Sequence, residues 1–138
     1  MRLETKGRAR ALQALYAWDI RGAQPGTLER IAEQAWDDLV VSSDERLFAT
    51  ELIRFIARNQ DDLDRALSSV TTNWRLERIG AIERCVLRLA GAELLDGTTP
   101  PRVVLREAVR LAERYGTGQS ARFVNGVLDA VAREAGRL

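Results

Sequence analysis

Apolar residues recur at intervals of three and four along almost the whole chain, and this spacing limits the fold more than any other feature. It places an apolar stripe along one side of a helix, whereas a strand requires apolar and polar residues to alternate. No stretch shows that alternation, and there is no internal repeat or low-complexity segment. A chain of 138 residues also buries enough surface to fold without disulfides or metal. The sequence therefore predicts an all-α fold.

The breaks between the apolar stripes predict about seven helices, arranged as two small sub-bundles of one compact domain. Turn and cap residues mark these breaks: the loop 22–26, the capping box of Ser42 and Glu45, the pair Asn59-Gln60, and the pair Pro100-Pro101. The polar segment 68–73 is the expected boundary. Residues 1–68 then form an N-terminal sub-bundle with a basic arm, and residues 69–138 form a C-terminal one.

Two glycines carry specific expectations. Gly116 follows an apolar helical stretch, and we expect it to end that helix in the left-handed conformation, which glycine adopts without steric cost. Gly126 lies in the middle of the next apolar stretch, where glycine costs about 1 kcal/mol relative to alanine. We expect this cost to be offset by a close approach to another helix.

The chain contains no histidine and one cysteine, and this composition excludes several kinds of site. Histidine-based acid–base catalysis is excluded, a structural zinc site lacks its usual ligands, and no paired carboxylates stand out. We therefore expect no cofactor, no metal and no catalytic residue. Cys85 lies in an apolar helical stretch, where a small buried side chain is expected. No apolar run approaches the ~20 residues of a membrane span, and the N-terminus lacks a signal peptide's apolar core, so we expect a cytoplasmic protein.

The net charge of +1 hides an uneven distribution along the chain. Residues 1–26 carry +3, residues 27–67 carry −5 and residues 68–138 carry +3. Positive charge at both ends is compatible with an anionic partner held on one face. Arginine supplies 20 of the 21 basic residues. Arginine binds phosphate in a bidentate way that lysine does not, but the codon usage of a high-GC genome would give the same bias.

The N-terminal helix carries a basic stripe on one of its faces. Arg2, Lys6, Arg10 and Gln13 follow one another at steps of four, four and three, so they share that face, and Arg8 lies off it. Helix N-termini favour acidic residues, because the helix dipole is positive there. A cationic first turn therefore indicates a negatively charged partner, and its alternative is a solvated basic end.

The loop from Gly116 to Ser120 has two interpretations. Backbone N–H groups at a helix N-terminus bind anions readily, and Arg122 follows in the next turn. The alternative is an ordinary turn between helices, since the loop lacks the lysine and the preceding strand of a P-loop. Tyr115 either stacks on a nucleobase or belongs to the core. Asn125 lies in mid-helix, where an amide is costly unless it bonds to a specific partner.

Three segments carry a resemblance to a known family: ALQALYAWD at 11–19, RIGAIERCVLRLAGAELL at 78–95, and PPRVVLREAVRLAERYGTGQSARFVNGVLD at 100–129. Together, and in this order, they resemble the NusB family of bacterial transcription antitermination factors. The resemblance implies a helical, non-enzymatic protein built from two small sub-bundles. It also implies binding to the single-stranded boxA element of ribosomal RNA leaders, together with the ribosomal protein NusE. Other Nus factors and RNA polymerase would then join indirectly.

The resemblance also assigns roles to individual residues. Lys6 and Arg8 match the family's arginine-rich motif, while Arg10 and Gln13 are added through their place on the Lys6 stripe. Tyr115 stands where the family often has phenylalanine, and Gln119 stands where an acidic residue is common in some members. The expected RNA contacts are Lys6, Arg8, Arg10, Gln13, Tyr115, Gln119, Ser120, Arg122 and Asn125. The expected NusE contacts are Tyr16 and Glu83.

Two other functions stay open at this point. A NusB-like domain also forms the N-terminal, RNA-binding part of rRNA cytosine methyltransferases, but the present sequence has no Rossmann-type glycine motif or catalytic cysteine pair. The other alternative is a helical adaptor that binds only proteins, and the basic arm distinguishes it from an RNA-binding protein. The same helical surface is open to a homodimer as well as to NusE.

Overall fold

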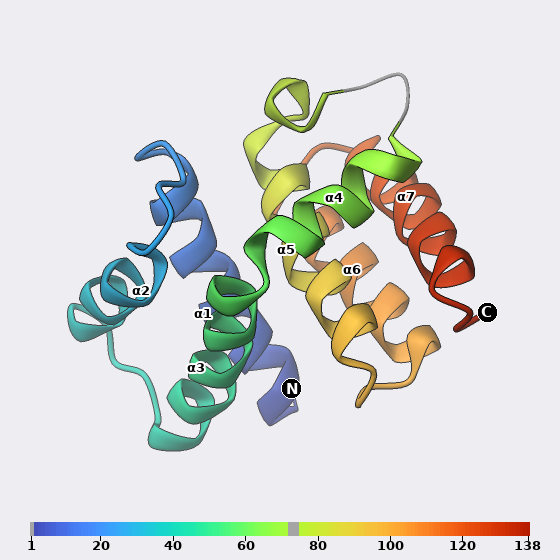
Figure 1. The fold of residues 1–138 in the computed structure, drawn as a ribbon. Helices are drawn as coiled ribbons and strands as arrows, with labels where there is room; N and C mark the ends of the chain where they lie inside the picture. Colours follow the sequence, from blue (N-terminus) through green and yellow to red (C-terminus); the bar gives the residue numbers. More distant parts are fainter. Residues whose placement is uncertain (1, 72–74) are drawn as a thin grey trace. The chain divides into compact units, whose positions relative to one another are not determined.

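The computed structural model describes residues 2–71 and 75–138. These residues form seven α-helices and one short 3-10 helix, η1, with no strand among them (Figure 1). The elements are α1 (Leu3–Asp19), α2 (Leu28–Asp37), α3 (Ser43–Arg58), α4 (Gln60–Val70), η1 (Leu76–Arg78), α5 (Ala81–Asp96), α6 (Pro101–Tyr115) and α7 (Ser120–Glu134). The predicted all-α fold is thus confirmed.

The chain divides into two compact units, residues 1–60 and 61–138. This division falls earlier than the boundary that the sequence placed after residue 68. The reason is that α4 packs within the second unit: a Cβ built on Gly91 of α5 would lie 3.0 Å from a methyl carbon of Leu63 and 3.5 Å from one of Leu67. The predicted linker 68–73 is helical as far as Val70, and its last two residues lie outside the described ones.

In the first unit, α1 packs against both α2 and α3. Two buried tryptophans tie these helices together, because each indole N–H finds a backbone acceptor. Trp18 donates to the carbonyl of Gln24 at 3.0 Å, and Trp36 donates to the carbonyl of Arg10 at 2.9 Å. A buried tryptophan satisfied in this way contributes apolar contact area without leaving a polar atom unpaired.

Only one of the two hydrogen bonds of the predicted capping box forms at the start of α3. The Ser42 hydroxyl accepts the backbone N–H of Glu45 at 3.2 Å, as expected. The carboxylate of Glu45 instead accepts Nε–H of Arg10 at 3.3 Å. The Glu45 side chain therefore orients a cation of α1.

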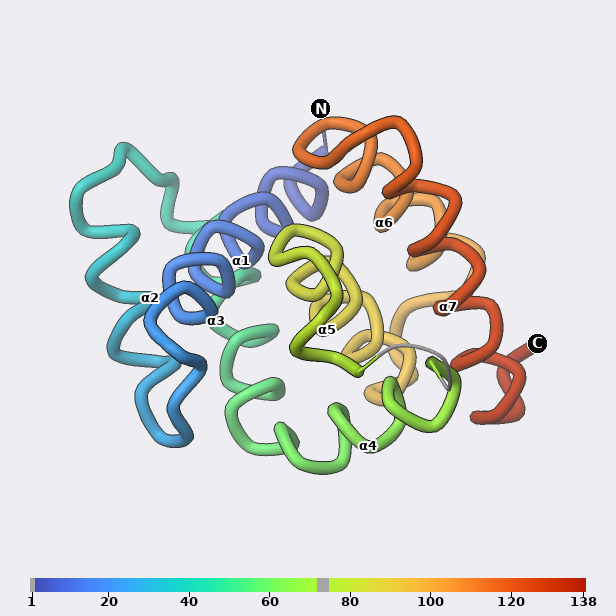
Figure 2. Tube along the Cα trace, turned by 90° about the horizontal axis from the view of Figure 1, so that it is seen from above, coloured from blue at the N-terminus to red at the C-terminus, as the bar shows by residue number. Residues whose placement is uncertain are grey.

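In the second unit, α5 is the central helix, and it contacts both α6 and α7. Ten consecutive residues, from Cys85 to Leu94, are buried, which confirms the expectation for Cys85. Figure 2 shows α6 and α7 side by side along this unit. Arg88, in the buried part of α5, donates to both carboxylate oxygens of Asp64 in α4, at 3.1 and 3.3 Å. A bidentate pair of this kind sets the register between two helices more than it adds stability.

The ends of α6 follow the expected chemistry at one end only. Pro101 occupies the first turn, where its missing N–H costs nothing. At the other end, Gly116 has φ −102° and ψ −155°, which is extended backbone, so the predicted left-handed cap is wrong. Glycine is needed there for space: a Cβ on Gly116 would lie 2.5 Å from Oγ of Ser120 and 2.8 Å from the carbonyl oxygen of Ala112.

The expectation for Gly126 is also wrong. A Cβ built there meets nothing within 4 Å, and the residue is exposed. No close approach of helices therefore offsets the cost of this glycine. It lies instead in the exposed surface of α7, next to Asn125.

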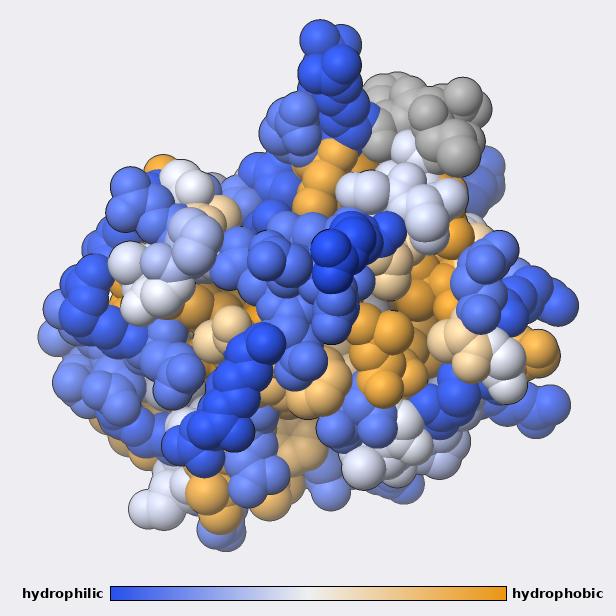
Figure 3. All heavy atoms as spheres, in the orientation of Figure 1, coloured by the Kyte–Doolittle hydropathy of each residue, from blue (hydrophilic) through white to orange (hydrophobic). Residues whose placement is uncertain are grey.

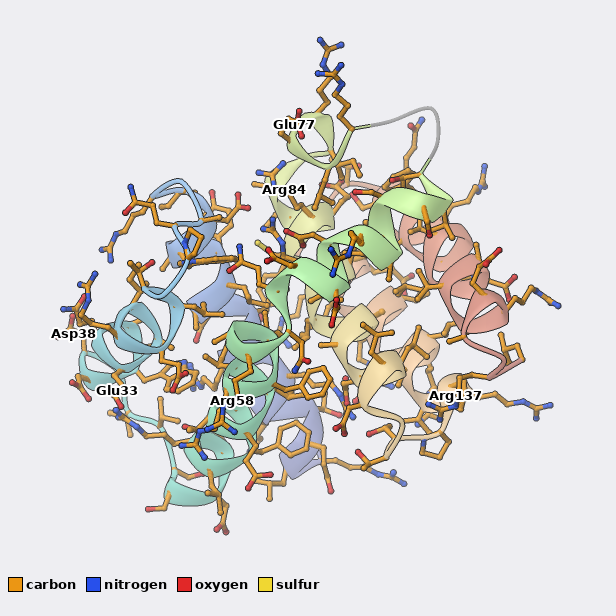
Figure 4. All side chains as sticks on the ribbon, in the orientation of Figure 1. Glu33, Asp38, Arg58, Glu77, Arg84 and Arg137 are labelled. Carbon is orange, nitrogen blue, oxygen red and sulfur yellow. The ribbon has the colours of Figure 1, made fainter. Side chains whose placement is uncertain are left out.

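The last residues of the described chain are anchored to the second unit. Arg137 donates to the carbonyls of Leu94 at 2.9 Å, Gly97 at 3.3 Å and Thr99 at 3.4 Å. Figure 4 labels Arg137, which lies beside the start of α6. This residue therefore holds the connection between α5 and α6.

No helix within the described residues is long and apolar enough to cross a membrane.

Candidate nucleic-acid interface

One exposed basic surface lies along α1. It consists of Arg2, Lys6, Arg10 and Gln13, and we call it the α1 stripe. Arg2, Lys6 and Gln13 are exposed, and Arg10 is partly exposed. Arg10 is oriented by two bonds, since it donates to Glu45 and, from Nη1, to Oε1 of Gln13 at 3.2 Å. The stripe thus presents three cations and an amide at successive turns of one helix.

Arg8 lies on a different side of α1 from the stripe. It is only 4% exposed, and its guanidinium carbon lies 5.3 Å from the centre of the Phe48 ring. The neighbouring Gly7 allows this packing, because a Cβ there would meet Phe48 at 2.5 Å. Arg8 therefore links α1 to α3, and its burial does not fit the direct RNA contact expected from the sequence.

A second candidate surface lies where α7 begins. The loop between α6 and α7 is closed by Ser120, which is 2% exposed. The Ser120 hydroxyl donates to Oε2 of Glu83 at 2.5 Å and accepts the backbone N–H of Thr117 at 2.9 Å. Ser120 thus joins the loop to α5, and this geometry does not fit the direct RNA contact expected of it.

An open groove of about 560 Å³ runs beside this loop. Its walls come from η1, the start of α5, the loop and the first turn of α7. The lining residues are Arg78, Ile79, Gly80, Glu83, Thr117, Gln119, Ser120, Arg122 and Phe123. Two of the predicted RNA contacts, Gln119 and Arg122, are exposed and line this groove. The partly exposed Phe123 lines it with them.

Arg78 was missed by the sequence reasoning. It is exposed at the end of η1 and lines the groove, which therefore contains a second cation besides Arg122. Its position depends on Arg84, whose Nη1 donates to the carbonyls of Leu76 at 3.2 Å and Ile79 at 2.5 Å. Figure 4 shows Arg84 and Glu77 at this end of the unit, and Figure 3 shows the hydrophilic side chains that project there. A single turn of 3-10 helix has no periodic pattern that could have singled out Arg78.

Tyr115 and Asn125 are both exposed, but neither is among the residues that line the groove. Tyr115 ends α6 and is 41% exposed, and the guanidinium of Arg114 lies 5.5 Å from its ring centre. This exposure excludes the core alternative for Tyr115. Asn125 is exposed on α7, three residues after Arg122, so water can satisfy its amide.

The two expected partner residues differ in accessibility. Tyr16, in the first unit, is 40% exposed and lies one turn beyond Gln13 on α1, while Ile20, one turn further, is 63% exposed. Glu83, in the second unit, is half-buried and already accepts a hydrogen bond from Ser120.

Within the described residues, no group of three or more His, Cys, Asp or Glu side chains is placed to hold a metal ion.

The sequence matches the NusB family over residues 5–133. This chain belongs to the NusB family. The transcription antitermination protein NusB of Sorangium cellulosum is 39% identical over 139 residues, covering 100% of this chain and 97% of the relative.

Solved structures of the family have the same fold. The structure of T. maritima NusB superposes with a TM-score of 0.84 at 35% identity, covering 95% of this chain and 91% of that one. A structure of the antitermination factors NusB and NusE in complex with dsRNA superposes with a TM-score of 0.76 at 31% identity, covering 97% and 98% of the two chains. The family resemblance drawn from the sequence is thereby confirmed.

Proposed function

We propose that this protein is a transcription antitermination factor that binds boxA-type RNA of ribosomal RNA leaders together with the ribosomal protein NusE. The observation that carries the proposal is the family match through residues 5–133, which includes both units. A relative over the full chain is a transcription antitermination protein, and a related structure holds NusB, NusE and RNA together. The protein acts by assembly in the cytoplasm and not as an enzyme.

The α1 stripe supplies the electrostatic part of RNA binding. Arg2, Lys6 and Arg10 neutralise backbone phosphates, and each such contact releases counterions from the RNA. Glu45 keeps the Arg10 side chain in place, so less of its conformational freedom is lost on binding. Affinity from this surface depends steeply on salt and weakly on sequence.

The groove and the exposed tyrosine supply the sequence-dependent part. Unpaired bases stack on aromatic rings, and Tyr115 offers an exposed one at the end of α6. Arg78 and Arg122 on the groove walls bind the phosphates that flank such bases. The Gln119 amide both donates and accepts hydrogen bonds, which suits it to a base edge.

NusE binds at surfaces that include Tyr16 and Glu83. A second protein in contact with the same RNA makes each partner bind more tightly in the presence of the other. The joint complex then recruits other Nus factors and, through them, RNA polymerase. Tyr16 and Ile20 fit such a role because they are large apolar side chains exposed on one face of α1.

The decisive experiment is RNA binding measured by fluorescence anisotropy with and without NusE, over a series of salt concentrations. We expect boxA-type single-stranded RNA to bind more tightly with NusE present, and a scrambled RNA of equal length to bind more weakly. The duplex of the same sequence is a necessary second probe, since the related complex contains dsRNA. Equal, weak affinity with and without NusE would contradict the proposal. The mass of the protein in solution, measured alongside, identifies any homodimer.

A further inference from the structure

Two residues that the sequence assigned to different partners are joined in the structure. Ser120, expected at the RNA surface, donates its hydroxyl hydrogen to Oε2 of Glu83, expected at the NusE surface, over 2.5 Å. Ser120 opens α7, and Glu83 lies in the first turn of α5, so 37 positions of sequence separate them. This bond connects the candidate partner surface with the candidate RNA loop inside one unit.

The hydroxyl of Ser120 uses its full bonding capacity. A hydroxyl has one donor and two acceptor positions. The donor goes to Glu83, because an ionised carboxylate can only accept, and the acceptors receive the backbone N–H of Thr117 at 2.9 Å and the Thr117 hydroxyl at 3.2 Å. The position of Thr117 is therefore tied to the position of the Glu83 carboxylate through a single oxygen atom.

The loop has little room to move independently of that oxygen. Ser120 is 2% exposed, and the backbone of Gly116 passes so close to it that a Cβ would lie 2.5 Å from its Oγ. On the other side, Glu83 folds back over the start of its own helix, where a Cβ on Gly80 would lie 2.5 Å from Oε1. A shift of the carboxylate therefore moves the serine and with it the loop that carries Gln119.

We propose that the Ser120–Glu83 hydrogen bond couples NusE binding at Glu83 to RNA binding at the loop 116–119. Ser120 is then a positioning residue and not an RNA contact. NusE holds the Glu83 carboxylate still and so stabilises the bonded arrangement of the loop before RNA arrives, and the loop loses less conformational entropy when RNA binds. This inference rests on the proposed function, and it adds the route by which the two partners assist each other.

The first test compares Ser120→Ala with a control on the same helix. The control is Arg133→Gln, which removes an exposed hydrogen bond of 2.8 Å to Asp129 near the other end of α7. The measured quantity is the ratio of the boxA RNA dissociation constants without and with saturating NusE. We expect a ratio of about 10 for the unmodified protein and for Arg133→Gln, and a ratio near 1 to 2 for Ser120→Ala. An unchanged ratio in Ser120→Ala overturns the inference.

Two substitutions of Glu83 separate the bond from the charge. Glu83→Gln keeps an oxygen that can accept from Ser120, whereas Glu83→Ala removes it. We expect Glu83→Gln, at saturating NusE, to keep most of the coupling ratio and Glu83→Ala to lose it as Ser120→Ala does. Equal ratios in the two variants contradict the route through this bond. Circular dichroism confirms beforehand that each variant is folded.

A third measurement needs no substitution and no RNA. Hydrogen exchange of the Thr117 amide reports directly on its bond to Ser120. We expect NusE to slow this exchange about 5-fold or more, because the bond from Thr117 to Ser120 then opens less often. NusE binding without any change at Thr117 overturns the inference. If the unmodified protein binds RNA no better with NusE, the proposed function itself fails, so the two failures are distinguishable.

Discussion

The α1 stripe and the groove beside α7 present cations to solvent in different ways. The stripe is a row of long side chains on one helix, and none of its members needs another segment of chain to reach solvent. The groove is assembled from η1, α5, the α6–α7 loop and α7, and Ser120 and Arg84 hold its walls with partly buried hydrogen bonds. The stripe can therefore attract any polyanion, whereas the groove can select a shape.

The largest effect is expected from reversing charge on the stripe. Arg2→Glu with Lys6→Glu should weaken boxA RNA binding roughly 100-fold at low salt, and the slope of log affinity against log salt should fall by about 1.4, for two lost phosphate contacts. Anisotropy titrations over a salt series measure both quantities. Arg30→Glu, which reverses an exposed charge on α2, is the control. A loss of affinity with no change in slope would mean that the stripe does not contact phosphate.

The second effect tests how closely the loop between α6 and α7, which lines the groove, is packed. Gly116→Ala should lower the free energy of unfolding by about 2 kcal/mol, because the new methyl group collides with Ser120. Gly126→Ala is its matched partner in the same unit, and it should raise that free energy by up to about 1 kcal/mol, since a Cβ there faces open space in a helix. Urea unfolding measures both. Effects of the same sign would contradict the packing described for the loop.

Removing the exposed ring tests base selection. Tyr115→Ala should weaken boxA RNA binding about 10-fold through lost stacking, while Tyr115→Phe should stay within about 2-fold of the unmodified protein. The salt slope should be unchanged in both variants, since no phosphate contact is lost. This pattern separates the groove side from the stripe. A 10-fold loss in Tyr115→Phe would indicate that the phenol hydroxyl, and not the ring face, makes the contact.

The smallest effect on RNA is expected at Arg8, which shares α1 with the stripe but not its exposure. Arg8→Gln should lower the free energy of unfolding by about 1 kcal/mol, because the guanidinium no longer lies over Phe48. RNA affinity of the folded variant should change less than about 2-fold. Urea unfolding and anisotropy test the two halves of this prediction. An affinity loss comparable with that of the Arg2→Glu, Lys6→Glu double variant would mean that Arg8 contacts RNA.

These two regions also differ in how far the sequence could predict them. Helical spacing alone placed Lys6, Arg10 and Gln13 on one face of α1, because neighbours on a helix surface are set by local geometry. The same local rules located Pro101 and the Ser42 cap. The helix start after the loop indicated Arg122, the family resemblance added Gln119, and the structure brings both to one groove.

What the sequence missed depends on contacts between distant segments. Nothing local indicates that Ser120 meets Glu83, or that α4 belongs with α5. The predicted roles of two glycines were also wrong, since a glycine needed for a positive φ and a glycine needed for a close approach look the same in a sequence. Gly116 turned out to need space and not a positive φ, and Gly126 needed neither.

The burial of α5 has a consequence for synthesis on the ribosome. From Cys85 to Leu94 this helix is covered on all sides, and α6 and α7, which contact it, are translated after it. While those helices are still inside the exit tunnel, a nascent chain exposes the most apolar helix of its second unit to the cytosol. The interval ends only when α7 emerges, so slow decoding between α5 and α7 would prolong contact with chaperones and raise the risk of aggregation.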